Sequence, residues 1–172
     1  MEKMLKKLKK IMVVVAAAVM LSAGFATVAP KEASAHWADG AMDWGLRNGY
    51  ITADLRDNYA TRQDTWLIIT RVANDLSGGS SYAASRNYVM NRKISDGSNP
   101  QAYVTRGQVC QMLYRAAHPG AYGTIDDHGA YSWARAKKIV QEADGRGARV
   151  AEAATRAEVM TMIRQAWFIG AL

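Results

Sequence analysis

Three stretches of this 172-residue chain share one pattern: ATRQD at residues 60–64, VTRGQ at 104–108 and ATRAE at 154–158. Each has a small or branched apolar residue, then Thr-Arg, and then Asp, Gln or Glu three residues after the Thr. Ahead of an apolar run, this order is typical of a capping box, in which two side chains satisfy free amides at the start of a helix. The pattern therefore predicts three helix N-termini, each cap stabilising its helix by about 1 kcal/mol.

The residues after each Thr-Arg pair have the spacing of an amphipathic helix. Counted from the Thr, positions +4, +7, +8 and +11 carry apolar or small side chains and lie on one helix face. The capping pairs are Thr61 with Asp64, Thr105 with Gln108, and Thr155 with Glu158. The faces are Thr65-Ile68-Ile69-Val72, Val109-Met112-Leu113-Ala116 and Val159-Met162-Ile163-Ala166.

A second helical segment precedes each of these helices, so the chain reads as a threefold repeat. The Thr residues are 44 and 50 residues apart, and an aromatic residue stands 24, 23 and 24 residues before them (Trp37, Tyr82 and Tyr131). The aromatic residue opens the second segment, and the predicted loops are 52–60, 95–104 and 144–154. Since no strand-like alternation occurs, we predict an all-α fold of three helix-loop-helix repeats, at 36–76, 81–118 and 124–172.

Residues 1–35 have the features of a secretory signal peptide. Lysines precede an apolar stretch at 11–21, and Ala33-Ser34-Ala35 is a small-residue cleavage site. Cleavage after Ala35 would start the mature chain at His36. An uncleaved anchor is the alternative, because apolar residues continue to Ala29.

The charge of the remaining chain argues against a nucleic-acid partner. The formal charge is +7, of which residues 1–35 carry +4, so about +3 remains. Of the 16 basic residues after position 35, 13 are Arg, whose planar guanidinium suits carboxylate ligands, although a compositional bias explains this equally well. The single cysteine, Cys110, excludes an internal disulfide and is predicted to be a buried, inert thiol. The three His residues lack metal-ligand spacing, so we expect neither metal nor cofactor.

Capping does not explain the arginine at the first helical position of each motif. A cation there lies at the positive end of the helix dipole, at a cost of up to about 1 kcal/mol. Three such costs suggest that Arg62, Arg106 and Arg156 bind an anion together with free helix amides. Removing Arg156 should then leave stability nearly unchanged. The alternative is that each Arg pairs with a carboxylate of a neighbouring repeat.

The motifs and their spacing resemble the S-layer homology (SLH) family, whose repeats have an aromatic-led helix, a Gly-containing loop and a Thr-Arg-x-Glu motif opening the next helix. The resemblance covers residues 36–172 and is closest in ISDGSNPQAYVTRGQVCQMLYRAA, from Ile94. It implies a pseudo-threefold arrangement around a central bundle of the three helices after Thr-Arg, with grooves between adjacent repeats.

The resemblance also implies a function. SLH modules are non-catalytic and bind cell-wall polysaccharide, commonly one with a pyruvate ketal, whose carboxylate would meet Arg62, Arg106 and Arg156, one in each groove. The Thr and acid or amide residues of the motifs are included in these expected sites. Secretion to a bacterial cell wall is implied, with another surface protein as a further partner and membrane contact only through the signal peptide. Trp44 and Tyr88 are candidates for stacking on sugar rings, although aromatic residues on a helix face more often belong to a core.

Two departures from the family pattern bear on which groove is active. Gly107-Gln108 replaces the acid of the second motif, and the third repeat has an expanded loop at 143–149. The third motif, ATRAE, is the most family-like and is our first choice, narrowly ahead of the first. Asp126-Asp127 is interpreted as a helix cap. A diverged cell-wall hydrolase, or an accessory subunit of one, is the alternative function.

Overall fold

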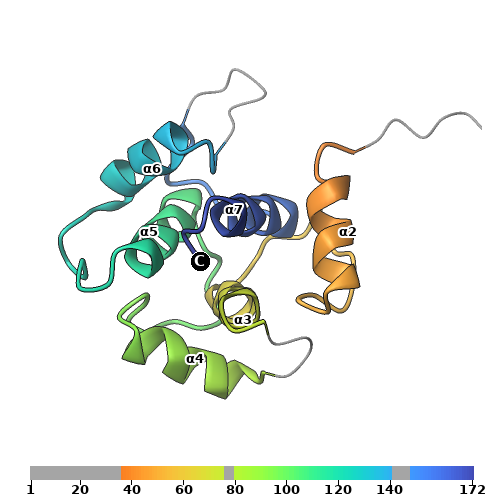
Figure 1. Cartoon of the computed structure of the whole chain (residues 1–172), viewed down its shortest axis with the longest axis horizontal. Coiled ribbons are helices and arrows are strands. Elements are labelled where there is room, and N and C mark those ends of the chain that lie inside the picture. The colour runs from red at the N-terminus through yellow and green to blue at the C-terminus, as the bar shows by residue number, and fades with distance from the viewer. Residues whose placement is uncertain (1–35, 76–79, 141–147) are drawn as a thin grey trace, which may run out of the picture. The chain divides into compact units, whose positions relative to one another are not determined.

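The computed structural model describes residues 36–75, 80–140 and 148–172, in which all regular secondary structure is helical (Figure 1). These ranges hold six helices and no strand, which confirms the all-α fold class. The helices are α2 (Asp39–Arg47), α3 (Arg62–Ala73), α4 (Tyr82–Asn91), α5 (Arg106–Ala117), α6 (Asp127–Ala136) and α7 (Arg156–Phe168). The predicted signal peptide and residues 144–147 of the third predicted loop lie outside the described residues.

All three predicted capping boxes are present, at the starts of α3, α5 and α7. Each Thr hydroxyl accepts from the amide three residues on at 3.2 Å. In return, the Thr amide donates to Asp64 at 3.3 Å, to Gln108 at 3.2 Å and to Glu158 at 2.8 Å. The longest of these bonds belongs to Asp64, whose side chain is one methylene shorter than that of Glu158.

The predicted apolar faces of α3, α5 and α7 form the core. Every residue at positions +4, +7, +8 and +11 is buried, except Ala116, which is half-buried. Trp66, Leu113 and Ile163 are among the fully buried side chains.

Of the other helices, α4 begins at the predicted aromatic residue, Tyr82, whereas α2 and α6 do not begin at Trp37 and Tyr131. The N-cap of α6 is Asp126, which accepts from the Gly129 amide at 2.7 Å, so Tyr131 lies inside the helix and the interpretation of Asp126 as a cap is confirmed. Trp37 precedes α2 and is 62% exposed, and Leu46 is exposed as well. The buried side of α2 is therefore formed by Ala41, Met42 and Gly45, without Trp37 or Leu46. The aromatic-to-Thr spacing placed the start of α6 too late, because the third repeat has extra residues in the loop between α6 and Thr155.

Each of these helices packs on the Thr-Arg helix of the preceding repeat unit. The pairs are α4 on α3, α6 on α5 and α2 on α7 (Figure 1). Three buried backbone hydrogen bonds close a cycle where the Thr-Arg helices begin. Ala60 N donates to Ala154 O, Ala154 N to Val104 O and Val104 N to Ala60 O, at 2.9–3.0 Å.

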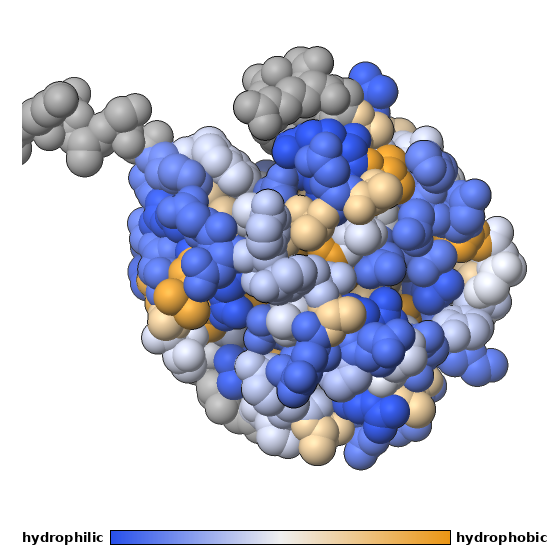
Figure 2. All heavy atoms as spheres, turned by 180° about the vertical axis from the view of Figure 1, so that it is seen from behind, coloured by the Kyte–Doolittle hydropathy of each residue, from blue (hydrophilic) through white to orange (hydrophobic). Residues whose placement is uncertain are grey.

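The face opposite to that of Figure 1 is largely hydrophilic, with small apolar patches (Figure 2). Among the described residues, none of the helices combines the length and apolar character that a membrane span requires.

A residue in the left-handed region ends each of α2, α4 and α6. These residues are Gly49, Lys93 and Lys138, with φ of 69°, 56° and 59°. The amide after each bonds back to a carbonyl of the last helical turn, as in Ile94 N to Val89 O at 2.8 Å. Glycine is favoured here because a Cβ is strained at positive φ.

We expect Lys93→Gly and Lys138→Gly each to raise the free energy of unfolding by about 0.5–1 kcal/mol, because glycine relieves the left-handed strain and loses only part of the gain to chain entropy. Denaturant melts measure this change. The matched control is Gly49→Ala, which should lower the free energy of unfolding by about 1 kcal/mol. A loss of stability in both Lys→Gly variants would contradict the assignment.

Candidate ligand-binding grooves

The helix amides that were expected to bind an anion are already used by the protein. The first two amides of α3 donate to Ala102 O and Pro100 O, both at 2.9 Å. Those of α5 donate to Glu152 O and Val150 O, and those of α7 to Asn58 O and Arg56 O, at 2.8–3.1 Å. The third amide goes to the capping Thr. The prediction of free amides is therefore wrong, because the loop of the next repeat in the cycle supplies the acceptors.

The Arg106 guanidinium forms an ion pair with Glu158, the acid of the third motif. It also donates to the Tyr131 hydroxyl at 3.3 Å, and the Arg106 residue is only 3% exposed. Burial disfavours its charge, but the Tyr131 and Glu158 oxygens outweigh this effect and raise the pKa of Arg106 above its usual value.

Arg156 pairs in the same way with the acid of the first motif. Its guanidinium lies 3.0 Å from the Asp64 carboxylate, and both side chains are less than one-fifth exposed. The Tyr82 hydroxyl donates to the other oxygen of Asp64 at 2.9 Å. Each acid therefore caps its own helix and also binds the Arg of the preceding motif in the cycle.

The second motif has Gln108 in place of the acid, so Arg62 pairs with a carboxylate outside the motif. It bonds to Asp96 at 2.6 Å and to the Ser98 carbonyl at 2.8 Å, both in the loop before α5. All three arginines thus pair with a carboxylate from a neighbouring repeat, which was the alternative to anion binding. The two roles do not exclude each other, because a guanidinium carries five donor hydrogens.

We expect Arg106→Ala to lower the free energy of unfolding by about 3 kcal/mol, because Glu158 loses its buried partner. Arg156→Ala should cost about 1.5 kcal/mol. Arg62→Ala should cost at most about 1 kcal/mol, since Asp96 is half exposed. Thermal and denaturant melts of the three variants measure these losses of stability and their order.

The control is Arg47→Ala, an exposed arginine of α2 whose side chain donates to Asp43 O in its own helix and to no other described residue. It should change stability little. An unchanged Arg156→Ala would restore the expectation from the helix dipole and contradict the structural role of this pair.

Gly107, the other departure of the second motif, lies where a side chain does not fit. An added Cβ would lie 2.6 Å from Val150 Cγ1, 2.7 Å from Asp127 Cβ and 3.1 Å from the Val150 carbonyl oxygen. The loop before α7 and the start of α6 therefore press against this turn of α5.

Gly107→Ala should accordingly lower the free energy of unfolding by about 1–3 kcal/mol, despite the higher helix propensity of Ala. Denaturant melts test this. Gly40→Ala is the matched control, because its Cβ would meet no atom closer than 3.9 Å. Equal effects of the two substitutions would argue against the steric explanation.

The largest cavity beside these arginines is the α7/α2 groove, of about 490 Å³. It is bounded by α7, the N-terminal half of α2, the loops before α3 and α7, and Arg106. Three arginines line it, Arg106, Arg149 and Arg164, against two carboxylates, Asp57 and Glu158. The lining thus has one more arginine than carboxylate. Arg106 and Arg149 are both ion-paired with Glu158, and Arg149 also lies 3.4 Å from the Glu152 carboxylate.

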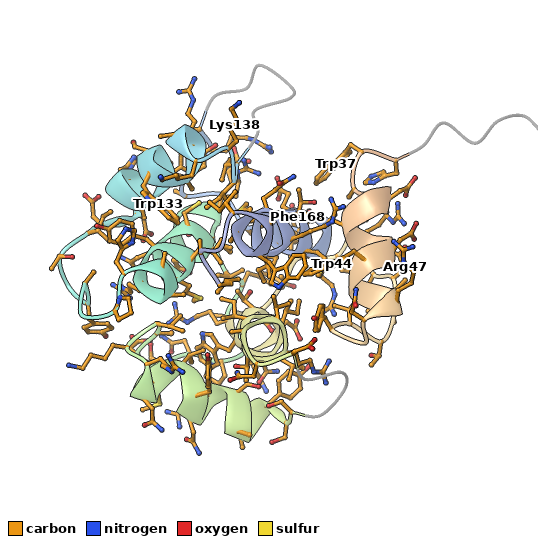
Figure 3. The ribbon with its side chains drawn as sticks, in the orientation of Figure 1. Trp37, Trp44, Arg47, Trp133, Lys138 and Phe168 are labelled. Carbon is orange, nitrogen blue, oxygen red and sulfur yellow. The ribbon has the colours of Figure 1, made fainter. Side chains whose placement is uncertain are left out.

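Buried polar atoms of this groove lack a hydrogen-bond partner among the described residues. They include Arg106 Nε, Thr161 Oγ1 and Arg164 Nε. Buried polar atoms are normally satisfied, so water or a ligand in the groove is expected to bind them. Trp37 lies at the N-terminal end of α2, on the rim of the groove (Figure 3).

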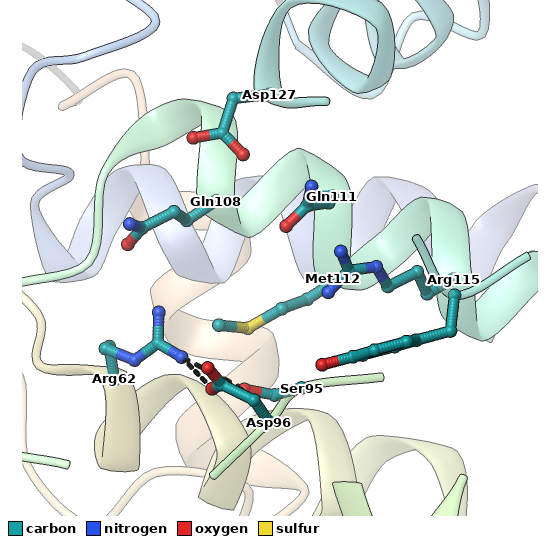
Figure 4. Close-up of a pocket in the computed structure, with 9 residues that line it drawn as sticks. Arg62, Ser95, Asp96, Gln108, Gln111, Met112, Arg115 and Asp127 are labelled. Atoms are coloured by element: carbon teal, nitrogen blue, oxygen red, sulfur yellow. Dashed lines mark hydrogen bonds and ion pairs between the residues drawn. The ribbon is translucent and has the colours of Figure 1, made fainter. Parts of the chain in front are cut away.

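The α5/α6 groove is the equivalent site one repeat earlier, and it is smaller, at about 170 Å³. Figure 4 shows Arg62 bound to Asp96 on one side and Asp127 across from Gln108 on the other. Burial raises the pKa of Asp127 and lowers that of Arg115. With Arg62 and Arg115 against Asp96 and Asp127, its charges balance.

Trp44 and Tyr88 line neither groove. Both are half-buried against the core, as the simpler reading of aromatic residues on a helix face predicted. Trp44 contacts the rings of Tyr50 and Trp167, at centroid distances of 5.0 and 5.4 Å. The Arg92 guanidinium lies over Tyr88, 5.5 Å from the ring centroid.

The sequence prediction missed the residues that give the α7/α2 groove its charge and its aromatic rim. Arg164 is two residues past the apolar position Met162, and Arg149 lies in a loop, so no repeat marks either of them. The polar flank at positions +3, +6 and +10 was visible in the sequence, because Glu158, Thr161 and Gln165 share one side of α7.

Other candidate chemistry is sparse in the described ranges. Cys110 is fully buried, and burial raises the pKa of its thiol to about 12. In residues 36–75, 80–140 and 148–172 no group of three or more His, Cys, Asp or Glu side chains is placed to hold a metal ion. No family model, curated protein or solved structure matches this chain.

Proposed function

We propose that this protein is a secreted, non-catalytic module that binds an anionic cell-wall polysaccharide in the α7/α2 groove. The observation that carries the proposal is the excess of arginine in a groove large enough for a small ligand, beside an exposed tryptophan. Guanidinium groups bind carboxylates through paired hydrogen bonds, and an indole ring stacks on the apolar face of a sugar.

The resemblance to SLH repeats supports this proposal from the sequence side. The three capped helices and the closed cycle of backbone bonds are compatible with a pseudo-threefold SLH arrangement around α3, α5 and α7. In this proposal the third repeat contributes Thr155 and Glu158 to the active groove, and the second contributes Arg106. The glycan carries a carboxylate, for which a pyruvate ketal is the first candidate.

Binding to purified bacterial wall sacculi that retain their secondary polysaccharide tests the proposal. Arg149→Gln and Arg164→Gln should each weaken co-sedimentation by about tenfold, because each removes a charged donor from the groove. Trp37→Ala should weaken it as well. Mild acid removal of ketals from the sacculi should reduce wild-type binding to the level of the variants.

The matched control is Arg47→Ala, on the side of α2 that faces away from α7 (Figure 3). It removes the same charge outside the groove and should bind as wild type. A parallel wall-lysis assay separates binding from hydrolysis. If the folded Arg149→Gln/Arg164→Gln double variant sediments like wild type, the groove is not the site.

A further inference from the structure

A second pocket, of about 560 Å³, lies where α2, α3 and α7 end. We call it the aromatic pocket. It is separate from the α7/α2 groove, which uses the opposite half of α2. Its lining includes three aromatic rings and three polar side chains: Trp44, Tyr50, Trp167, Asn48, Asn74 and Asp75.

The rings form a continuous surface. Trp44 lies between Tyr50 and Trp167, with interplanar angles of 57° and 45°. Figure 3 shows Trp44 between α2 and α7. Trp44 and Tyr50 are held in the core, whereas Trp167 is 40% exposed. The pocket therefore offers an ordered aromatic wall with one open ring, which costs little entropy to present to a ligand.

The polar side chains offer more free acceptors than donors, because each Asn amide group keeps only one further N–H. The amide nitrogens of Asn48 and Asn74 donate to the carbonyls of Trp44 and Thr70, both at 2.8 Å, at the ends of their own helices. The Tyr50 hydroxyl donates to Asp75 Oδ1 at 2.9 Å. The side-chain oxygens of both Asn residues and Asp75 Oδ2 receive no hydrogen bond from the described residues.

No arginine or lysine lines the aromatic pocket in the part of the chain that the structure describes. An anionic group is therefore disfavoured beside Asp75. A ligand that fits must have an apolar face for the rings and hydroxyl donors around its edge. A neutral pyranose ring has both features.

We infer that the aromatic pocket is a second binding site, for a neutral sugar ring. It goes beyond the proposed function, because it requires neither the arginines nor an anionic substituent. Trp37, at the groove, lies just before α2, and Trp44, at the pocket, lies seven residues later within α2, which corresponds to about 10 Å along the helix axis. One glycan chain following α2 could reach both sites, and two weak contacts on one chain would add to its avidity.

The direct test is a titration of the full chain with methyl glycosides of glucose, mannose and N-acetylglucosamine, followed by NMR of the tryptophan indole N–H groups. We expect saturable shifts of Trp44 and Trp167 with at least one glycoside, at millimolar affinity. Trp133, on α6, should not shift and serves as the internal control. Movement of Trp37 alone would place the sugar in the groove and overturn the inference.

Variants sharpen the assignment. Trp167→Ala should weaken glycoside binding by about tenfold, through loss of the open ring. Tyr103→Ala removes an exposed ring that does not line the pocket, and should have no effect. Arg149→Gln and Arg164→Gln should leave glycoside binding intact, so failure here and failure of the proposed function are distinguishable.

A cationic ligand is the competing outcome, because aromatic rings beside a carboxylate also attract ammonium groups. Choline is the probe for it. Saturation by choline with none by any glycoside, or no saturable shift of Trp44 and Trp167 with either, would overturn the inference. Asp75→Asn should change glycoside binding no more than a few-fold.

Discussion

The buried cycle of backbone hydrogen bonds among Ala60, Val104 and Ala154 is the contact on which the rest of the described structure depends. Buried backbone groups must be paired, and no repeat unit can pair these groups alone. The loops that these bonds hold together also place their carbonyls against the first amides of the Thr-Arg helix of the adjacent repeat. Helix capping, the order of the units and the positions of the grooves therefore follow from one closed set of bonds, and a single unit would leave its helix end unsatisfied.

This cycle changes what the repeated motif does. Thr and the residue three positions later cap the helix, and each Arg pairs with a carboxylate of a neighbouring repeat, so all the recurring side chains have a structural partner. The α7/α2 groove also contains Arg149 and Arg164, whose positions do not recur in the other repeats, and Arg149 is itself paired with Glu158 and Glu152. The proposed selectivity for an anionic glycan consequently depends on residues that differ between the repeats, whereas the helices that carry them recur.

Local features of the fold could be predicted from the sequence, and long-range ones could not. Capping and the apolar faces of α3, α5 and α7 depend on side chains within three to eleven residues of each other. The start of α6 was misplaced because an aromatic residue, Tyr131, was taken as the repeat marker instead of the cap Asp126. The partner of each Arg stayed open between a ligand and a neighbouring acid, since spacing alone cannot show that Glu158 faces Arg106 rather than Arg156.

The side chain at one position near the start of the outer helices α4, α6 and α2 explains why equivalent grooves differ in size. This position is Tyr82, Asp127 or Ala38, each eleven residues before the left-handed residue that ends its helix. Tyr82 reaches across to Asp64 and adds to the ion pair with Arg156, and Asp127 narrows the α5/α6 groove. Ala38 has no side chain beyond its Cβ, and beside it lies the 490 Å³ groove. Repeats with the same backbone can therefore differ in groove size through one side chain, and the smallest of the three residues follows Trp37, which lines the groove that contains Arg149 and Arg164.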